Sequence, residues 1–414
     1  MNTATLQRPW QHDAEVIGLI SLAHGTSHFF HLLLPPLFPW LIGDFGLNFT
    51  QCGVLMTVFF LISGIGQALA GFVVDRVGAG PVLLFGVGAL SVAGFLLGFA
   101  TDYQTLVVVA AIAGAGNSIF HPADFTLLNR QVSAPRLGHA FSSHGLVGNL
   151  GWAGGAAFMG TVAAIAGWHA AGFGAGGLAL AVFLVLALRR HRLLTDPQRA
   201  PADRPRHAQR RDGAFGFLKS SAVWMCFVFF FLSTGAFAVL QNFAPALLGH
   251  VFGASAVVAT AALTAYLLGS TAGMLLGGFV AGRSQHNDTT IALALGLSAA
   301  LAVWLALGAV PSWSLTGLLA MMGFGVGVAG PSRDLLVRRA ATAGFGASSY
   351  GRIYGFVYSG LDAGMALPPV VFGRLFDAGL FRSGLMGIAV LQVGALFTAV
   401  AVGRVALAHR RAGP

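Results

Sequence analysis

The chain has 414 residues, of which 56% are hydrophobic and only 9% are Asp, Glu, Lys or Arg. A soluble domain carries about 25% charged residues, so this composition excludes a water-soluble fold and places the chain in a lipid bilayer. A formal net charge of +10 is also found in proteins that bind nucleic acid. However, the basic residues lie between apolar stretches rather than on one helix or arm, so we interpret them as topological anchors and expect no nucleic-acid partner.

Taken in chain order, the apolar stretches have the length of about 20 residues that one bilayer crossing requires. Six fall in the first half, at 16–41, 52–74, 82–100, 105–128, 140–166 and 170–188. Six more fall in the second half, at 222–248, 256–281, 289–307, 315–337, 353–375 and 384–402. Because backbone groups in lipid must be satisfied internally, each stretch is predicted to be a helix. The expected fold class is an all-α integral membrane protein with twelve transmembrane helices.

A basic, proline-containing stretch separates the two halves. It predicts an N-terminal six-helix bundle over 1–188, a basic cytoplasmic linker over 189–221 and a C-terminal six-helix bundle over 222–414. The connections after odd-numbered spans hold only two basic residues, Arg374 and Arg382, whereas the linker and the connections after even-numbered spans hold most of the others. The positive-inside rule therefore predicts a multi-pass protein of the inner membrane with both termini in the cytoplasm.

Three motifs of the first half recur in the same order in the second. They are Gly71-x3-Asp75-Arg76 with Gly278-x3-Gly282-Arg283, Gly114-x-Gly116-x5-Pro122 with Gly323-x-Gly325-x5-Pro331, and Gly138-x2-Phe141-x7-Asn149-x-Gly151 with Gly351-x2-Tyr354-x7-Asp362-x-Gly364. Repeated order at similar spacing indicates a duplicated six-helix unit, so the two bundles are predicted to be pseudo-symmetric.

Twelve spans as six plus six, the basic central loop, and Gly71-x3-Asp75-Arg76-x-Gly78 together resemble the major facilitator superfamily over essentially the whole chain. The resemblance implies a transporter in which Asp75 and Arg76, with Arg283 in the second half, act as gate residues. That loop motif usually ends in one or two basic residues, but Ala79-Gly80-Pro81 follows here. At the motif of the first half, the gate interaction would therefore rest on Asp75 and Arg76 alone.

Within the superfamily, Ser118-Ile-Phe-His121-Pro122 and Gly148-Asn149-Leu-Gly151 look like the fosmidomycin-resistance branch of drug exporters. The span-five signature of drug antiporters is only partial, because Gly151-Trp152-Ala153-Gly154-Gly155 lacks their proline. The resemblance favours export and implies no cofactor. Proteins of the superfamily commonly work as monomers, which sets the expected oligomeric state.

Polar side chains inside the predicted spans form the candidate substrate and proton pathway, because an ionisable group at the bilayer centre costs at least about 2.5–3.5 kcal/mol and needs a reason. Three stripes have helical spacing: His24, His28 and His31; Asn117, His121 and Asp124; and Tyr354, Tyr358 and Asp362. The remaining candidates are His144, Asn149, Gln241, Asn242, Arg333 and Asp334. Whether the histidines bind substrate, a metal ion or only each other stays open.

Asp124 and Asp362 are the candidate proton carriers, because a carboxylate in a low-dielectric site can load and release a proton as access alternates. An equal alternative makes Asp124 a helix-end charge paired with Arg130. Arg333 and Asp334 are expected either to pair with each other or, through the guanidinium, to hold an anionic substrate.

Prolines mark two further features of the predicted spans. Pro35, Pro36 and Pro39 are expected to bend or end the outer part of span one, and Pro368 with Pro369 that of span eleven. Breaks of this kind suit the rocking or gating of a transporter, and simple termination of the helix is the alternative.

The leading functional hypothesis is a proton-coupled secondary transporter, not an enzyme, that moves a small polar or anionic molecule or drug, with export favoured. Proton-coupled uptake of an organic anion, or transport of a divalent metal or metal chelate, is the first alternative. A membrane metalloenzyme is a remote one, because His24-x3-His28-x2-His31 is a single histidine box. The sequence contains no G-x4-G-K-[ST] phosphate-binding loop, so ATP is not expected to be the direct energy source.

Overall fold

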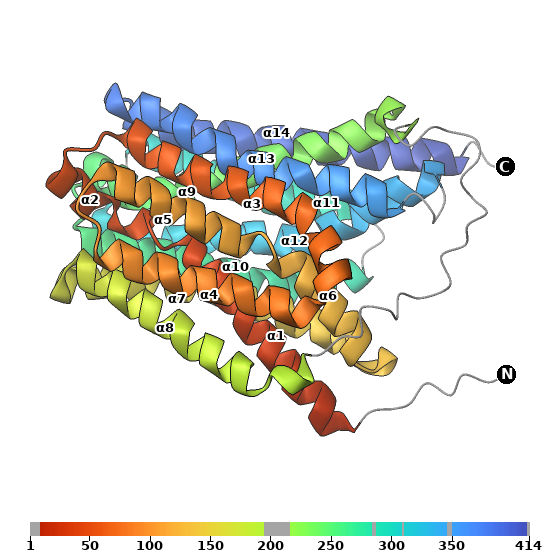
Figure 1. Ribbon diagram of the computed structural model, residues 1–414. Coiled ribbons are helices and arrows are strands. Elements are labelled where there is room, and N and C mark those ends of the chain that lie inside the picture. The colour runs from red at the N-terminus through yellow and green to blue at the C-terminus, as the bar shows by residue number, and fades with distance from the viewer. Residues whose placement is uncertain (1–8, 194–215, 284–286, 309, 346–349, 412–414) are drawn as a thin grey trace, which may run out of the picture. The chain divides into compact units, whose positions relative to one another are not determined.

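A computed structural model describes residues 9–193, 216–283, 287–308, 310–345 and 350–411, and all regular structure in these ranges is helical (Figure 1). The helices of the first half are α1 (Trp10–His31), α2 (Phe38–Phe45), α3 (Phe49–Val77), α4 (Ala79–Gly98), α5 (Tyr103–Asn117), α6 (Phe120–Gln131), α7 (Leu137–Ala166) and α8 (Trp168–Leu188). Those of the second half are α9 (Ser221–Phe252), α10 (Ala256–Arg283), α11 (Asn287–Leu307), α12 (Leu315–Phe345), α13 (Tyr350–Asp377) and α14 (Phe381–Arg411).

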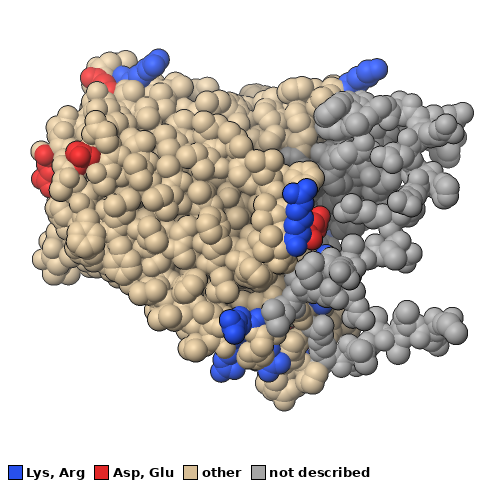
Figure 2. Space-filling view, viewed as in Figure 1, with Lys and Arg blue, Asp and Glu red and all other residues tan. Residues whose placement is uncertain are grey.

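The predicted twelve-helix count is confirmed. In the described ranges, ten spans are long and apolar enough to cross a membrane, and two of these are made of broken helices, Trp10–Phe45 and Tyr103–Gln131. The other two long helices, α7 and α13, have 30 and 28 residues and carry polar side chains such as His144 and Asp362. On the face shown in Figure 2, the described charged residues lie towards the helix ends and the wide surface between them is uncharged.

The chain forms two compact units, Met1–Leu47 with Val58–Ala200 and Asn48–Thr57 with Pro201–Pro414. In the first unit α1 packs against α7, and α4 against α8, which Figure 1 shows lying alongside it. In the second unit α9 packs against α13, and α11 against α14. Most of the predicted linker, residues 194–215, lies outside the described ranges, so the predicted domain limits stay predictions.

Close glycine contacts recur in the two units at the positions of the repeated motifs. A Cβ added to Gly114 would meet the backbone carbonyl of Phe59 on α3, and one added to Gly323 would meet that of Tyr266 on α10. A second pair of contacts corresponds in the same way, Gly116 with Gly86 and Gly325 with Ala294. Small residues let helix backbones approach closely in a membrane protein, so the duplicated motifs encode the same helix contacts twice.

The fifth and eleventh spans correspond in the same way. A Cβ added to Gly151 of α7 would meet the backbone of Gly25 on α1, and one added to Gly364 of α13 would meet the carbonyl of Phe231 on α9. The residue before Gly25 is His24, and the residue before Phe231 is Phe230. His24 and Phe230 therefore occupy equivalent places in the two units.

The prolines act differently in the first span and in the eleventh. As predicted, the first span breaks after His31, and a short 3-10 turn at Pro35–Leu37 precedes α2. In span eleven the alternative that Pro368 and Pro369 end the helix is wrong, because α13 continues through them to Asp377.

The fourth span was predicted as one helix over 105–128, and this is corrected by the structure. The helix is interrupted between Asn117 and Phe120, where α5 ends and α6 begins. Pro122 is the physical reason, since it has no N–H to bond the carbonyl of Ser118 four residues earlier. This break sets α6, with His121 and Asp124, in its own orientation within the first unit.

The first turns of α3 belong to the second unit, where they lie along the C-terminal half of α13. One carboxylate oxygen of Asp377 accepts the backbone N–H of Phe49 at 2.6 Å, and the other accepts that of Thr50 at 3.0 Å. Further along, the Thr57 hydroxyl donates to the carbonyl of Ala366 at 2.6 Å. Asp377 thus satisfies backbone N–H groups that a helix N-terminus leaves without internal partners.

Candidate functional site

The predicted histidine stripe on α1 faces α7, and the two helices build a continuous row of ring contacts, which is called the ring stack below. The indole of Trp152 stacks on His28, with ring centres 4.2 Å apart and an interplanar angle of 17°, whereas His28 is tilted by 50° against His24 at 4.3 Å. His24 in turn stacks on His144, at 3.6 Å and an interplanar angle of 22°. His24 and His144 are both buried, so this contact lies in the interior of the first unit.

Asp124 lies at the end of this stack and is completely buried. Its Oδ2 atom is 3.0 Å from His144 Nε2, with which it is hydrogen-bonded, and 3.2 Å from His24 Nδ1. The sequence left open whether Asp124 is an interior group or a helix-end partner of Arg130. Its burial between two imidazoles supports the interior role.

Three buried polar atoms of this cluster have no hydrogen-bond partner among the described residues. They are His24 Nδ1, whose short distance to Asp124 lacks hydrogen-bond alignment, His28 Nδ1 and Asp124 Oδ1. A buried group left unsatisfied costs about 1–3 kcal/mol. The cluster therefore has unused capacity for a proton, a polar ligand or a metal ion.

Gly148 on α7 makes the close approach of the imidazoles possible. A Cβ at this position would lie 2.9 Å from His24 Cδ2 and 3.0 Å from His28 Cε1. Asn149, the next residue and a predicted site residue, is half-buried. A side chain larger than glycine at position 148 would push both rings out of the stack.

His31 has a different environment from His24 and His28. The indole N–H of Trp152 donates to His31 Nδ1 at 3.0 Å, so this nitrogen is the acceptor and Nε2 carries the proton. His31 Nε2 then donates to Asn117 Oδ1 at 3.0 Å, which also accepts from Ser27, while Asn117 Nδ2 donates to Ser63 at 2.8 Å. His31 and Asn117, both predicted pathway residues, thus belong to one satisfied hydrogen-bond network, which is typical of packing residues.

His121 lies at the edge of the cluster and is exposed. Its Nδ1 is 2.7 Å from Gln67 Oε1, and because that oxygen only accepts, His121 Nδ1 is the donor. Its ring centre is 5.4 Å from that of His24, in an edge-on arrangement. His121 therefore borders the buried cluster without entering the ring stack.

The predicted site residues of the second unit are more dispersed. Gln241 and Asn242 on α9 are 0% and 1% exposed, and Asp362 on α13 is half-buried. The guanidinium carbon of Arg333 on α12 lies 4.9 Å from the ring centre of Phe230, in a cation–π contact. The side chains of three predicted residues, Asp334, Tyr354 and Tyr358, lie outside the described part, so the predicted Arg333–Asp334 pair and the stripe on α13 stay predictions.

The comparisons with known proteins are consistent with this helical architecture. Residues 20–369 match the sequence profile described as the Major Facilitator Superfamily. The chain belongs to this superfamily. Its members carry small-molecule substrates and lie in the lipid bilayer, so the protein is a multi-pass membrane transporter rather than an enzyme.

Relatives in the superfamily match shorter stretches. Over 137 residues the chain is 31% identical to the fosmidomycin resistance protein of Escherichia coli strain K12, and the stretch covers 33% of either chain. Over 80 residues it is 35% identical to the probable 4-methylmuconolactone transporter of Cupriavidus pinatubonensis, covering 19% of either chain. The aligned stretches thus span a third or less of the length of these relatives.

Two solved transporters share the fold along nearly the whole chain. A bacterial homologue of the human lysosomal transporter Spinster superposes with a TM-score of 0.71, 15% identity and 98% coverage of both chains. The nucleoside transporter NupG superposes with a TM-score of 0.72 and 15% identity, over 94% of this chain and 99% of its own. At this identity the likeness shows the superfamily fold alone.

The predicted gate residues lie at helix ends. Asp75 and Arg76 are exposed in the last turn of α3, and Arg283 is exposed at the end of α10. None of the ion pairs found within the described ranges involves them. Their positions agree with the superfamily motif, and their gating role stays a prediction.

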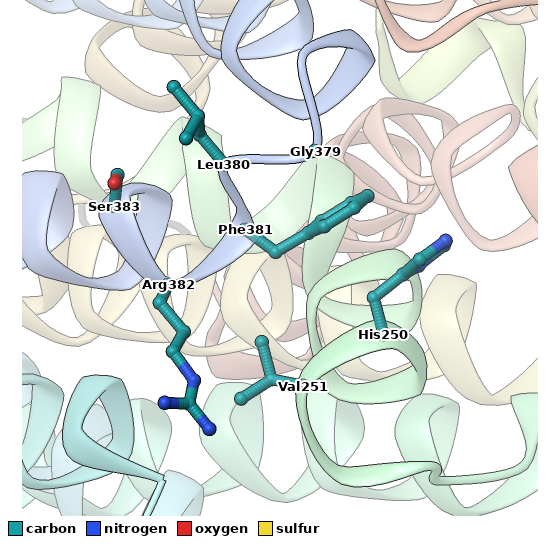
Figure 3. A pocket seen from close by; sticks show the side chains of 7 residues that line it. All are labelled: His250, Val251, Gly379, Leu380, Phe381, Arg382 and Ser383. Carbon is teal, nitrogen blue, oxygen red and sulfur yellow. The ribbon is translucent and has the colours of Figure 1, made fainter.

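A pocket of about 300 Å³ lies where α9 ends and α14 begins (Figure 3). His250 and Phe381 stack beside it with ring centres 4.0 Å apart, and the Arg382 side chain extends along its wall. No predicted site residue lines this pocket. It is a surface feature at helix ends, separate from the polar cluster of the first unit.

Sequence reasoning missed residues that complete the cluster. Trp152 and Gly148 follow His144 at steps of four, so the three residues form a stripe on α7 that faces the histidines of α1. Ser63 and Gln67 are also four residues apart on α3. Helical spacing could have found both stripes, but only the packed structure shows which stripes meet.

Proposed function

We propose that this protein is a proton-coupled secondary transporter that exports a small polar or anionic molecule across the inner membrane by alternating access. Export rests on the likeness to the fosmidomycin resistance protein, whose name describes resistance to a drug. The two repeated six-helix units supply the architecture in which one half rocks against the other. A monomer is sufficient for this mechanism.

Asp362 is the proposed proton carrier, and its environment is the observation that carries the coupling proposal. It lies near the middle of α13, half-buried, and takes part in none of the ion pairs found in the described ranges. A carboxylate inside a membrane helix is costly without a partner cation. Protonation removes that cost, and access to water on one side then releases the proton.

A polar or anionic substrate agrees with other groups of the second unit. The side-chain amide of Asn242 is buried, and neither its nitrogen nor its oxygen has a hydrogen-bond partner among the described residues. Arg333 presents a guanidinium, whose planar fork suits carboxylate or phosphate-like groups. These two side chains are the proposed recognition groups of the second unit.

The test uses purified protein in liposomes with a pH-sensitive dye in the lumen. Fosmidomycin, 4-methylmuconolactone and simple organic acids are added outside one at a time. In antiport, entry of a substrate expels protons and the lumen becomes alkaline. In symport the substrate brings protons in and the lumen becomes acidic, which would replace export by uptake.

The Asp362→Asn variant should bind the responding compound but move no protons, because the amide cannot be protonated. Asp288→Asn is the matched control, since Asp288 lies in the first turn of α11 and is expected to stabilise only the start of that helix. Unchanged proton movement in Asp362→Asn would remove this residue from the mechanism. Substrate flux that is indifferent to a pH gradient would rule out proton coupling.

The proposed topology places the basic central loop in the cytoplasm. A single cysteine introduced at Ala202 should resist a membrane-impermeant thiol reagent in intact cells and react after the cells are opened. The native Cys52 and Cys226 are buried and give little background. Labelling at position 202 in intact cells would show that the central loop lies outside the cytoplasm and would contradict the proposed topology.

A further inference from the structure

We propose that the first unit contains a binding site for a divalent first-row transition-metal ion, such as Zn²⁺ or Co²⁺, formed by His24 Nδ1, His144 Nε2 and Asp124 Oδ2. Each of these three residues offers one ligand atom, and the three ligand atoms lie within 4.8 Å of one another. They come from three different helices, α1, α7 and α6. The site goes beyond the proposed transport reaction and does not depend on Asp362.

The spacing of the three atoms suits a single small cation. Asp124 Oδ2 is 3.0 Å from His144 Nε2 and 3.2 Å from His24 Nδ1. Zinc binds nitrogen and oxygen ligands at about 2.0–2.2 Å in tetrahedral geometry, which places ligand atoms about 3.3 Å from each other. Small movements of the side chains are sufficient to place the three atoms around one ion.

The hydrogen bonding of the cluster favours a cation over a closed network. His24 Nδ1 and Asp124 Oδ1 are buried without hydrogen-bond partners among the described residues. The ion pairs of the described ranges give Asp124 no lysine or arginine, only the two histidines. A metal ion between the three side chains would satisfy His24 Nδ1 and neutralise the buried carboxylate.

Packing holds the ligands in place. His24 and His144 are 3% and 5% exposed and Asp124 is 0% exposed, so their rotamers are confined. The ring of His28 contacts that of His24 and stacks on the indole of Trp152. Sites on rigid helices with packed surroundings retain ligand geometry better than sites on loops.

The donor set selects the class of ion. Two imidazole nitrogens and one carboxylate oxygen suit zinc, cobalt or nickel, whereas calcium and magnesium prefer oxygen ligands alone. His31 is excluded as a ligand because both of its nitrogens are engaged by Trp152 and Asn117. The three-residue set also leaves a fourth tetrahedral position for water or a ligand of the cargo.

The test is titration of the purified full-length protein, carrying no polyhistidine tag, with Co²⁺ and Zn²⁺ in detergent. Calorimetry should give one site per chain, and bound Co²⁺ should show the visible absorption of a nitrogen- and oxygen-ligated ion. His144→Ala and Asp124→Asn should weaken binding about 100-fold or more, since even outer-sphere partners of metal ligands contribute about 10–100-fold. Zn²⁺ should raise the Tm of the unaltered protein but not of these variants.

His139→Ala is the matched control, because His139 lies on the same helix and is exposed. It should retain the affinity of the unaltered protein. Asp124→Asn changes no shape, so it keeps the test valid if His144→Ala fails to fold. Absence of binding, binding in both site variants as tight as in the unaltered protein, or an equal loss in His139→Ala would overturn the proposal. These titrations need no gradient, so their failure leaves proton-coupled transport untouched.

Discussion

The first unit holds Asp124 against an imidazole, whereas the second holds Arg333 against a phenyl ring, at equivalent places in the repeat. Both residues lie two positions after the proline of the repeated glycine-proline motif. In the first unit Asp124 Oδ2 lies 3.2 Å from His24 Nδ1. In the second unit the guanidinium carbon of Arg333 lies 4.9 Å from the ring centre of Phe230. The two units thus share the helix contacts around this place, but the first carries an acidic residue there and the second a basic one.

The surroundings changed together with the charge. By the repeated motif of spans five and eleven, which aligns Gly138 with Gly351, the counterpart of His144 is Val357. Phe230 and Val357 both belong to the apolar core cluster of the second unit, whereas His24 and His144 carry the polar cluster of the first. Glycine contacts between helix backbones therefore maintain the fold, and the side chains at this place are free to specialise.

The largest expected effect tests whether the glycine contacts are equivalent. Gly114→Ala and Gly323→Ala should each destabilise the protein by about 1–3 kcal/mol or more, because the added methyl meets a backbone carbonyl that cannot move aside as a side chain can. Thermal unfolding in detergent would measure both variants.

Gly71→Ala and Gly278→Ala are the controls, since an added Cβ at either position meets nothing within 4 Å. They should leave Tm unchanged or raise it slightly, because alanine favours a helix by up to about 1 kcal/mol over glycine. A large loss at Gly114 with none at Gly323 would show that the repeated contacts do not support the two units equally.

A smaller effect separates packing histidines from site histidines. Trp152→Phe removes the N–H that donates to His31 and leaves an aromatic ring against His28. The loss of stability should be about 0.5–1.5 kcal/mol, as for one hydrogen bond, with Co²⁺ affinity nearly unchanged. Trp304→Phe, at a side chain that is 45% exposed, is the control. A large loss of Co²⁺ affinity in Trp152→Phe would contradict this separation.

The smallest effect concerns the start of α5. Asp102 accepts both the backbone N–H and the hydroxyl of Thr105, at 2.7 and 2.8 Å. The backbone hydrogen bond from Thr105, with that of its hydroxyl, holds the pKa of this carboxyl below its usual value of 3.8. Because the folded pKa is depressed, the stabilisation is complete above pH 3.8 and is lost as the pH falls through the folded value.

Asp102→Asn should therefore have a slightly lower Tm than the unaltered protein at neutral pH, and the difference should shrink in acid. The corresponding start of the second unit's α12 has a 3-10 turn at Ser312–Ser314 in place of such a cap. Removing the Ser314 hydroxyl, which donates to Pro311, should give no comparable pH dependence. A pH-independent difference in Asp102→Asn would indicate that charge has no part in the cap.

Much of this architecture follows from local patterns. Apolar length predicted the twelve helices, and the spacing of the repeated glycines predicted the duplication that Phe59 and Tyr266 now confirm by contact. Pro35 and Pro36 predicted the break of span one, because their effect acts through their own backbone. Pro122 has the same local cause, yet the interruption that it makes in span four was not predicted.

The candidate site was less accessible to sequence reasoning. Spacing placed His24, His28 and His31 on one face, but the partner on α7 depends on how two helices rotate about their axes. With the rotation that the structure has, Trp152 donates a hydrogen bond to His31, and His24 lies next to Asp124. The burial of Asp124 also depends on the orientation of α6 after its break, which no spacing along the chain specifies.

The cap on α3 has a consequence for the order in which the chain is completed. Asp377 lies 328 residues after Phe49, so at about 5–20 residues per second the ribosome delivers it on the order of tens of seconds after the helix that it caps. Until then the N–H groups of Phe49 and Thr50 have no carboxylate. The start of the second transmembrane segment is thus among the last places to complete its hydrogen bonds. A nascent chain released before residue 377 would lack the carboxylate that caps this helix.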